Sequence, residues 1–110
     1  MPNYLLQISY TPEAWTALLK NPADRRAAIA GAIAKLGGTM DHAWFAFGDY
    51  DIIGVLSMPS NVSAAALSFA VSAGGACKTV KTTPLMSVED GMEALKAAAT
   101  CGYKAVTASA

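Results

Sequence analysis

The chain contains few of the residues that carry most familiar protein chemistry. Its 110 residues include one histidine, His42, and two cysteines, Cys77 and Cys101, which lack CxxC spacing. One histidine and two distant cysteines do not supply the ligands of a zinc site, and the sequence has neither a phosphate-binding glycine loop nor a GxSxG elbow. We therefore predict no metal site and no cofactor.

Charge of one sign and long hydrophobic runs are also lacking. Eight Lys and Arg residues balance eight Asp and Glu residues and are spread over the whole length, so we expect neither nucleic-acid binding nor a polybasic membrane segment. No apolar run reaches the roughly 18 residues that a membrane-spanning helix needs. A strand-like pattern begins at residue 3, which leaves no room for a targeting segment. With both cysteines expected as reduced thiols, this predicts a cytoplasmic protein.

Apolar residues, in contrast, are abundant. They make up 54% of the chain, above the usual share of about 45–50%. A chain of this length supports one core, so we expect a single domain over residues 1–110, with its core at about 3–98 and a C-terminal tail at 99–110. The excess apolar surface predicts an obligate homo-oligomer.

The order of the expected elements indicates an α+β fold. Cap residues, glycine stops and apolar periodicity predict strands at 3–10, 39–47, 50–58 and 76–84, a bent helical arm from Thr11 to Leu36 that restarts at Asn21-Pro22, a helix at about 60–73, and a short helix opened by Ser87. Lysines and threonines in the last strand favour a sheet edge. This order predicts a ferredoxin-like βαββαβ domain, an antiparallel four-stranded sheet with its helices on one face.

The second face of that sheet is the part of the fold that offers chemistry. A tight turn at Gly48-Asp49 would pair Ala46 with Asp51, and alternation along the strands then sorts the hairpin residues into two sets. The helix-facing set is Asp41, Ala43, Phe45, Phe47, Tyr50, Ile52, Gly54 and Leu56. The opposite set, joined by Leu5, Gln7 and Ser9, is Met40, His42, Trp44, Ala46, Asp51, Ile53, Val55 and Ser57. We call this second set the mixed face, because it is too apolar for open solvent and yet contains polar groups.

The run "YTPEAW…NPADRRAAIAGAIAKLGGTMDHAWFAFGDYDIIGVLSMPSN" resembles the GYD domain family, whose glycine, tyrosine and aspartate correspond to Gly48, Tyr50 and Asp51. The resemblance covers about residues 3 to 95 and includes Thr79 to Thr83 in the last strand. It implies a ferredoxin-like protomer that pairs sheet to sheet into a dimeric α/β barrel, and it implies no reaction. Ser57 and Ser60 stand where acidic residues are common in the family.

His42 is the first candidate for catalysis, because imidazole exchanges protons near neutral pH. Asp51 or Tyr50 would orient its proton or the substrate. Each of the three also has a structural interpretation: a histidine bonded to a backbone carbonyl, an aspartate that accepts hydrogen bonds from turn amides, and a tyrosine that packs its ring.

Trp44, with Met40 and Ile53, would wall an apolar cavity or would fill a dimer interface. Gln7, Ser9 and Ser57 are candidates for polar contacts to a ligand. Two functions follow. One is a cofactor-independent dimer that binds a small hydrophobic molecule and isomerises, dehydrates or oxygenates it; the other is a noncatalytic ligand-sensing or scaffold module.

Overall fold

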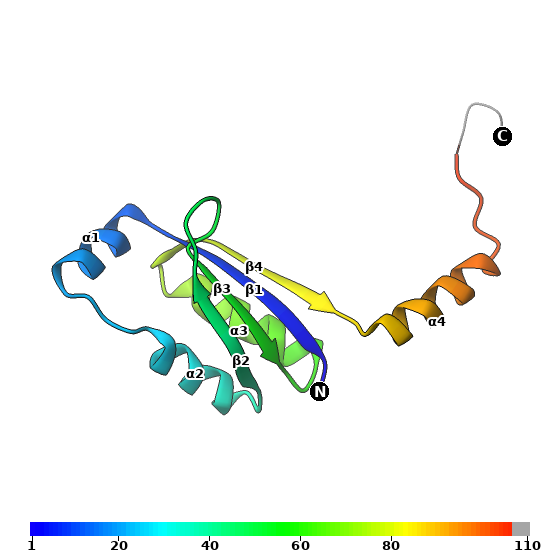
Figure 1. Ribbon diagram of the computed structural model, residues 1–110, viewed down its shortest axis with the longest axis horizontal. Coiled ribbons are helices and arrows are strands. Elements are labelled where there is room, and N and C mark those ends of the chain that lie inside the picture. Colours follow the sequence, from blue (N-terminus) through cyan, green and yellow to red (C-terminus); the bar gives the residue numbers. More distant parts are fainter. Residues whose placement is uncertain (107–110) are drawn as a thin grey trace.

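The computed structural model describes residues 1–106; residues 107–110, which end the expected tail, lie outside the described residues. In chain order the elements are β1 (Asn3–Tyr10), α1 (Pro12–Lys20), α2 (Arg26–Lys35), β2 (Thr39–Phe45), β3 (Ile52–Ser57), α3 (Asn61–Ala73), β4 (Cys77–Leu85) and α4 (Val88–Ala99). Figure 1 shows α2 and α3 beside a single sheet, with α1 and α4 at its two ends.

The four strands form one antiparallel sheet in the order β2-β3-β1-β4. The predicted α+β class and four-stranded antiparallel sheet are confirmed. The prediction that the last strand lies at an edge is also confirmed, and β4 carries Lys78, Lys81 and Pro84 there. Proline is tolerated at an edge because it has no N–H to donate to a further strand.

Side-chain caps begin the helices at three of the expected places. The hydroxyls of Thr11, Ser60 and Ser87 each accept a hydrogen bond from a backbone N–H in the first turn of α1, α3 and α4. Such caps satisfy amides that the helix itself leaves without partners. The expected restart at Asn21-Pro22 is wrong: α2 begins at Arg26, whose N–H and guanidinium both donate to Asp24. The arm is therefore two separate helices.

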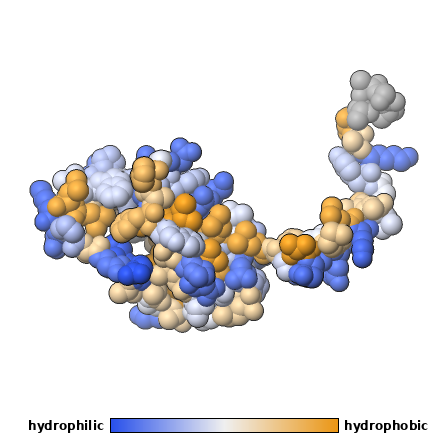
Figure 2. Space-filling view, in the orientation of Figure 1, coloured by the Kyte–Doolittle hydropathy of each residue, from blue (hydrophilic) through white to orange (hydrophobic). Residues whose placement is uncertain are grey.

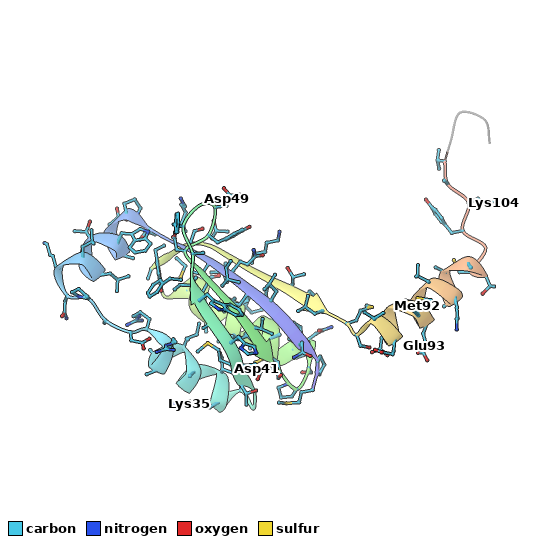
Figure 3. All side chains as sticks on the ribbon, in the orientation of Figure 1. Lys35, Asp41, Asp49, Met92, Glu93 and Lys104 are labelled. Carbon is cyan, nitrogen blue, oxygen red and sulfur yellow. The ribbon has the colours of Figure 1, made fainter. Side chains whose placement is uncertain are left out.

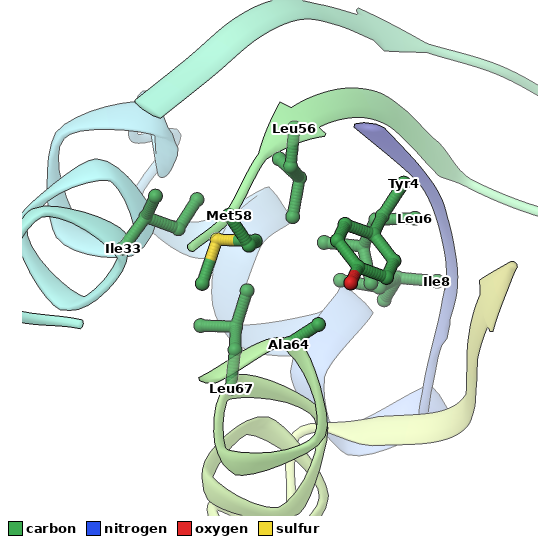
Figure 4. Close-up of a cluster of buried hydrophobic side chains, with 8 residues drawn as sticks. All are labelled: Tyr4, Leu6, Ile8, Ile33, Leu56, Met58, Ala64 and Leu67. Atoms are coloured by element: carbon green, nitrogen blue, oxygen red, sulfur yellow. The ribbon is translucent and has the colours of Figure 1, made fainter. Parts of the chain in front are cut away.

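The core lies on one face of the sheet, where β1 and β3 meet α2 and α3 (Figure 4). Its buried members are Tyr4, Leu6, Ile8, Ile33, Leu56, Met58, Ala64 and Leu67. Alternate residues of β1 point into this core, so the residues between them point to the other face. Complete burial of side chains such as Leu6 and Leu56 stabilises the fold by about 1.5–3 kcal/mol each. The core therefore determines which face of the sheet stays uncovered.

The β2–β3 hairpin has the predicted register from His42 to Ala46, but a longer loop. Phe45 pairs with Ile52, and the N–H of Ala46 donates to the carbonyl of Asp51 at 2.8 Å, as the expected turn required. The strands end at Phe45 and begin again at Ile52, whereas the sequence predicted 47 and 50. Gly48 has a φ of 138°, a value that residues with a Cβ rarely adopt. Residues 46–51 form this loop, which projects beyond the sheet (Figure 1).

Helix α4 extends away from the rest of the molecule. None of residues 88–99 is buried, and Figure 2 shows both apolar and polar residues along this projection. The radius of gyration is 17.9 Å, whereas a compact chain of this length has about 13 Å. Among residues 1–106, therefore, no side chain of α4 is buried against the rest of the fold.

We expect Gly38→Ala to destabilise the protein. A Cβ at this buried position would overlap the Met58 sulfur and the Ser57 carbonyl oxygen, and overpacking of this kind costs about 1–3 kcal/mol. The free energy of unfolding in urea measures the effect. Gly31→Ala in α2 is the matched control, because a Cβ there meets nothing within 4 Å among the described residues; it should stabilise by about 0.5–1 kcal/mol. Equal stability of the two variants would contradict this packing.

Candidate functional site

The mixed face is uncovered within residues 1–106, because α2 and α3 pack on the opposite face. On it, Trp44 lies opposite Ile53 and His42 lies opposite Val55. Gln7 pairs with Ile53 on the other side, so these side chains form one contiguous surface across β2, β3 and β1. Trp44 is 55% exposed. Antiparallel sheets usually present alternating polar residues to water, and the apolar members of this surface depart from that pattern.

Two residues lie on the opposite face from the one predicted. The pairing shifts between Met40 and His42, so Asp41 is an extra residue in β2. A bulge of this kind reverses the alternation for the residues before it. Met40 packs against the core, which removes it from the predicted ligand wall, and Asp41 contacts residues of the mixed face instead of facing the helices.

His42 and Trp44 form a flat aromatic surface. Their ring centroids are 5.6 Å apart and their planes differ by 14°, which is a stacked arrangement. The two residues are neighbours on one side of β2 because side chains two positions apart share a face. The predicted ligand contact Trp44 therefore stacks on His42, and both side chains are exposed.

The carboxylate nearest in the chain to this pair is that of Asp41. Ser57 Oγ donates to it at 2.6 Å and Thr39 Oγ1 donates at 2.9 Å. These hydrogen bonds, first that from Ser57 and then that from Thr39, lower the pKa of Asp41, and the charge of His42 lowers it further. Asp41 is therefore a fixed anion beside His42. Sequence reasoning missed it, because alternation alone does not reveal a bulge.

Ser57 is committed to this small network. Its hydroxyl donates to Asp41 and accepts a hydrogen bond from the Asn3 side-chain amide at 3.1 Å. The hydroxyl predicted to contact a ligand thus orients the carboxylate. Gln7 is half-buried near the middle of the sheet, between Ile53 and Lys81, where its amide can face a ligand on the mixed face.

Asp51 ties the hairpin loop to β1. Its carboxylate accepts from the Tyr10 N–H at 2.9 Å, and its own N–H donates to the Ile8 carbonyl at 2.7 Å. Ser9, which is 5% exposed, donates its hydroxyl to the Asp49 carbonyl at 2.7 Å. These bonds extend the contact between the loop and β1 beyond the regular ladder. Asp51 and Ser9 therefore have structural tasks.

His42 and Asp51 are not brought together within one chain. Val55, opposite His42, is four residues beyond Asp51, which corresponds to roughly 13 Å along a strand. Figure 3 shows their chain neighbours apart, with Asp49 on the hairpin loop and Asp41 lower on the sheet. Tyr50 belongs to the same distant loop. The predicted catalytic group of His42, Asp51 and Tyr50 is thus divided between two places.

Two hollows in the surface of the described residues lie away from His42. A groove of about 480 Å³ runs between α3 and β4, and a second hollow of about 360 Å³ lies near Met1 and Met86.

Residues 1–106 contain no group of three or more His, Cys, Asp or Glu side chains placed to hold a metal ion. Cys77 and Cys101 are free thiols. Within the same residues, no helix has the length and apolar character to cross a membrane.

We expect Asp51→Ala to destabilise the protein without any ligand present. The variant loses a hydrogen bond between a charged carboxylate and a half-buried strand, an interaction of roughly 1.5–3 kcal/mol. Asp51→Asn retains an acceptor oxygen and should lose less. Asp49→Ala is the control, since only the backbone carbonyl of Asp49 takes part. Thermal unfolding ranks the stabilities of the three variants. An Asp51→Ala variant as stable as Asp49→Ala would contradict the inference that the Asp51 carboxylate holds the loop on β1.

Comparison with known proteins identifies the family. Neither a curated protein nor a solved structure matches the chain. The model of the GYD domain matches residues 4–95, a range that includes the sheet except for Asn3, α1 to α3, and most of α4. The loop that contains Gly48, Tyr50 and Asp51 lies inside this range, and the predicted family is confirmed. The chain belongs to the GYD domain family.

Proposed function

We propose that this protein is a homodimer that binds a small, largely apolar molecule between two mixed faces, against the His42–Trp44 pair. One observation carries the proposal. The imidazole of His42 and the indole of Trp44 are stacked and exposed on an apolar sheet surface, and no helix of residues 1–106 covers that surface. Flat aromatic surfaces bind apolar and planar molecules by stacking, and a half-exposed tryptophan is a common anchor at interfaces.

A second copy supplies what one chain lacks. The described part of a single chain offers Trp44, Ile53 and Val55 on one wall only, whereas a ligand site is usually enclosed on most sides. In a two-fold dimer the same surface provides the opposite wall. This arrangement agrees with the ferredoxin-like, dimeric α/β barrel that the family resemblance implied. A cytoplasmic location stays a prediction.

The catalytic version of the proposal places proton exchange at His42. An imidazole that removes a proton from one position of a ligand and returns it to another isomerises the ligand without any further reactant. Asp41 adjoins His42 in the chain and its hydrogen bonds from Ser57 and Thr39 hold its carboxylate in place, whereas Asp51 is bonded to β1. Asp41 therefore takes the orienting part first assigned to Asp51 or Tyr50. If the two faces fill each other without a cavity, the protein is the noncatalytic scaffold module.

The assembly is tested by Val55→Arg. An arginine in the centre of the mixed face would carry its charge into a dry interface without a partner, so the dimer should dissociate. Sedimentation equilibrium should give a smaller assembly for the variant than for the wild type. Leu19→Arg is the control, because Leu19 is exposed on α1, away from this face. A monomeric wild type, or a Val55→Arg variant that forms an assembly as large as that of the wild type, would contradict the proposed interface.

Ligand binding is tested by tryptophan fluorescence in a Trp15→Phe background, which leaves Trp44 as the single indole. Anilinonaphthalene sulfonate, a planar apolar probe, should quench Trp44 saturably, and Trp44→Ala with Trp15 retained should weaken probe binding by roughly tenfold or more, as expected for an aromatic anchor. Trp15 is the matched control, because it packs on Tyr10 at the start of α1. Equal binding by the two single variants would contradict a site at Trp44.

A further inference from the structure

Helix α3 has an apolar side that residues 1–106 leave exposed. Its 13 residues, NVSAAALSFAVSA, include one asparagine and three serines but no charged side chain. Ala64 and Leu67 face the core, but Phe69 on another side is 73% exposed. Within the described residues, the helix is therefore buried on one side only.

That bare side forms one wall of the larger groove. We call it the α3–β4 groove, and it is lined by Tyr4, Asn61, Ala64, Ala65, Ser68, Phe69, Val80, Lys81, Thr82 and Pro84. Its α3 wall is made mostly of small side chains, which allow the backbone of another helix to approach closely. Lys81 lies in register with Gln7 of the mixed face, so its side chain points away from α3 although the residue borders the groove. The groove thus fits a helix with an apolar stripe.

Helix α4 has such a stripe. Val88, Met92, Leu95 and Ala99 recur at the spacing of one helical face, and the three larger ones are exposed. Glu89, Glu93 and Lys96 lie together to one side of the stripe, so this flank carries charges of both signs. Twelve residues form a helix of about 18 Å, close to the length of the 13-residue α3 beside which it would lie.

We infer that α4 of one chain docks in the α3–β4 groove of a second copy. Two observations favour a second copy over the helix's own chain. Only Met86 and Ser87 separate β4 from α4, and α4 leaves the end of β4 away from the body, so that the described chain extends over 59 Å (Figure 1). Exchange of an identical helix is an economical route to a two-fold dimer, because each copy offers both the helix and the groove.

Apolar contact carries the docking. Met92 and Leu95 would cover Phe69 and the small residues of α3. This exchange uses neither His42 nor Trp44, and so it does not depend on the proposed ligand site.

The test is disulfide cross-linking between two chains that each carry one cysteine, in a background with Cys77→Ser and Cys101→Ser. One chain carries Met92→Cys at the middle of the α4 stripe, and the other, extended by a tag, carries Ala65→Cys at the middle of the groove. Mid-to-mid positions meet whichever way the helix runs. Mild oxidation should give the mixed disulfide, because cysteines link only when their Cα atoms come within about 7 Å.

Glu93→Cys is the matched control, since residue 93 is adjacent in sequence to Met92 but lies on the polar flank (Figure 3). It should lose the mixed disulfide. Absence of the Met92→Cys product, or an equal yield from Glu93→Cys, would overturn the inference. A disulfide that forms only inside a single chain carrying both Met92→Cys and Ala65→Cys would show that α4 folds back on its own groove, and that result would also overturn it.

Discussion

The packing of Leu6 and Leu56 against Ile33 and Leu67 is the contact on which the rest of the structure depends. It joins the two central strands to α2 and α3 and commits every second residue of those strands to one side. The residues between them then lie on the other face of the sheet, because successive side chains of a strand point to opposite faces. Trp44, His42 and Ile53 thus lie together as a consequence of how the core is filled.

The site is shaped by a single extra residue. Without the bulge at Asp41, Met40 would share a face with His42, and the carboxylate would point toward the helices. The bulge instead places Met40 in the core and brings Asp41 to two hydroxyl donors, Thr39 and Ser57. An apolar wall is thereby exchanged for an anchored negative charge beside an imidazole. The chemistry available on this surface is more polar than an unbroken strand would give.

Much of the fold could be predicted from local patterns. Caps at Thr11, Ser60 and Ser87 carry their own signal, and the hairpin register could be predicted because Gly48 requires a turn at that point. The alternation was correct from His42 to Phe45 and failed at Asp41, since a bulge leaves no mark in the order of apolar and polar residues. The hydrogen bond that Asp51 makes to β1 could not be predicted for a different reason. Its partner is a backbone N–H on β1, 41 positions away in the chain, and no local pattern shows such a bond.

The bulge at Asp41 has a second effect, on the outer border of the sheet. β2 and β4 are the two border strands, and a border strand with a regular row of free amides and carbonyls recruits further strands from other molecules. In β2 the extra residue interrupts that row and sets a charge beside it, while in β4 Pro84 and two lysines do the same. Neither border is a good template for fibril growth, and so a chain that is more than half apolar can accumulate without extending its sheet from one molecule to the next.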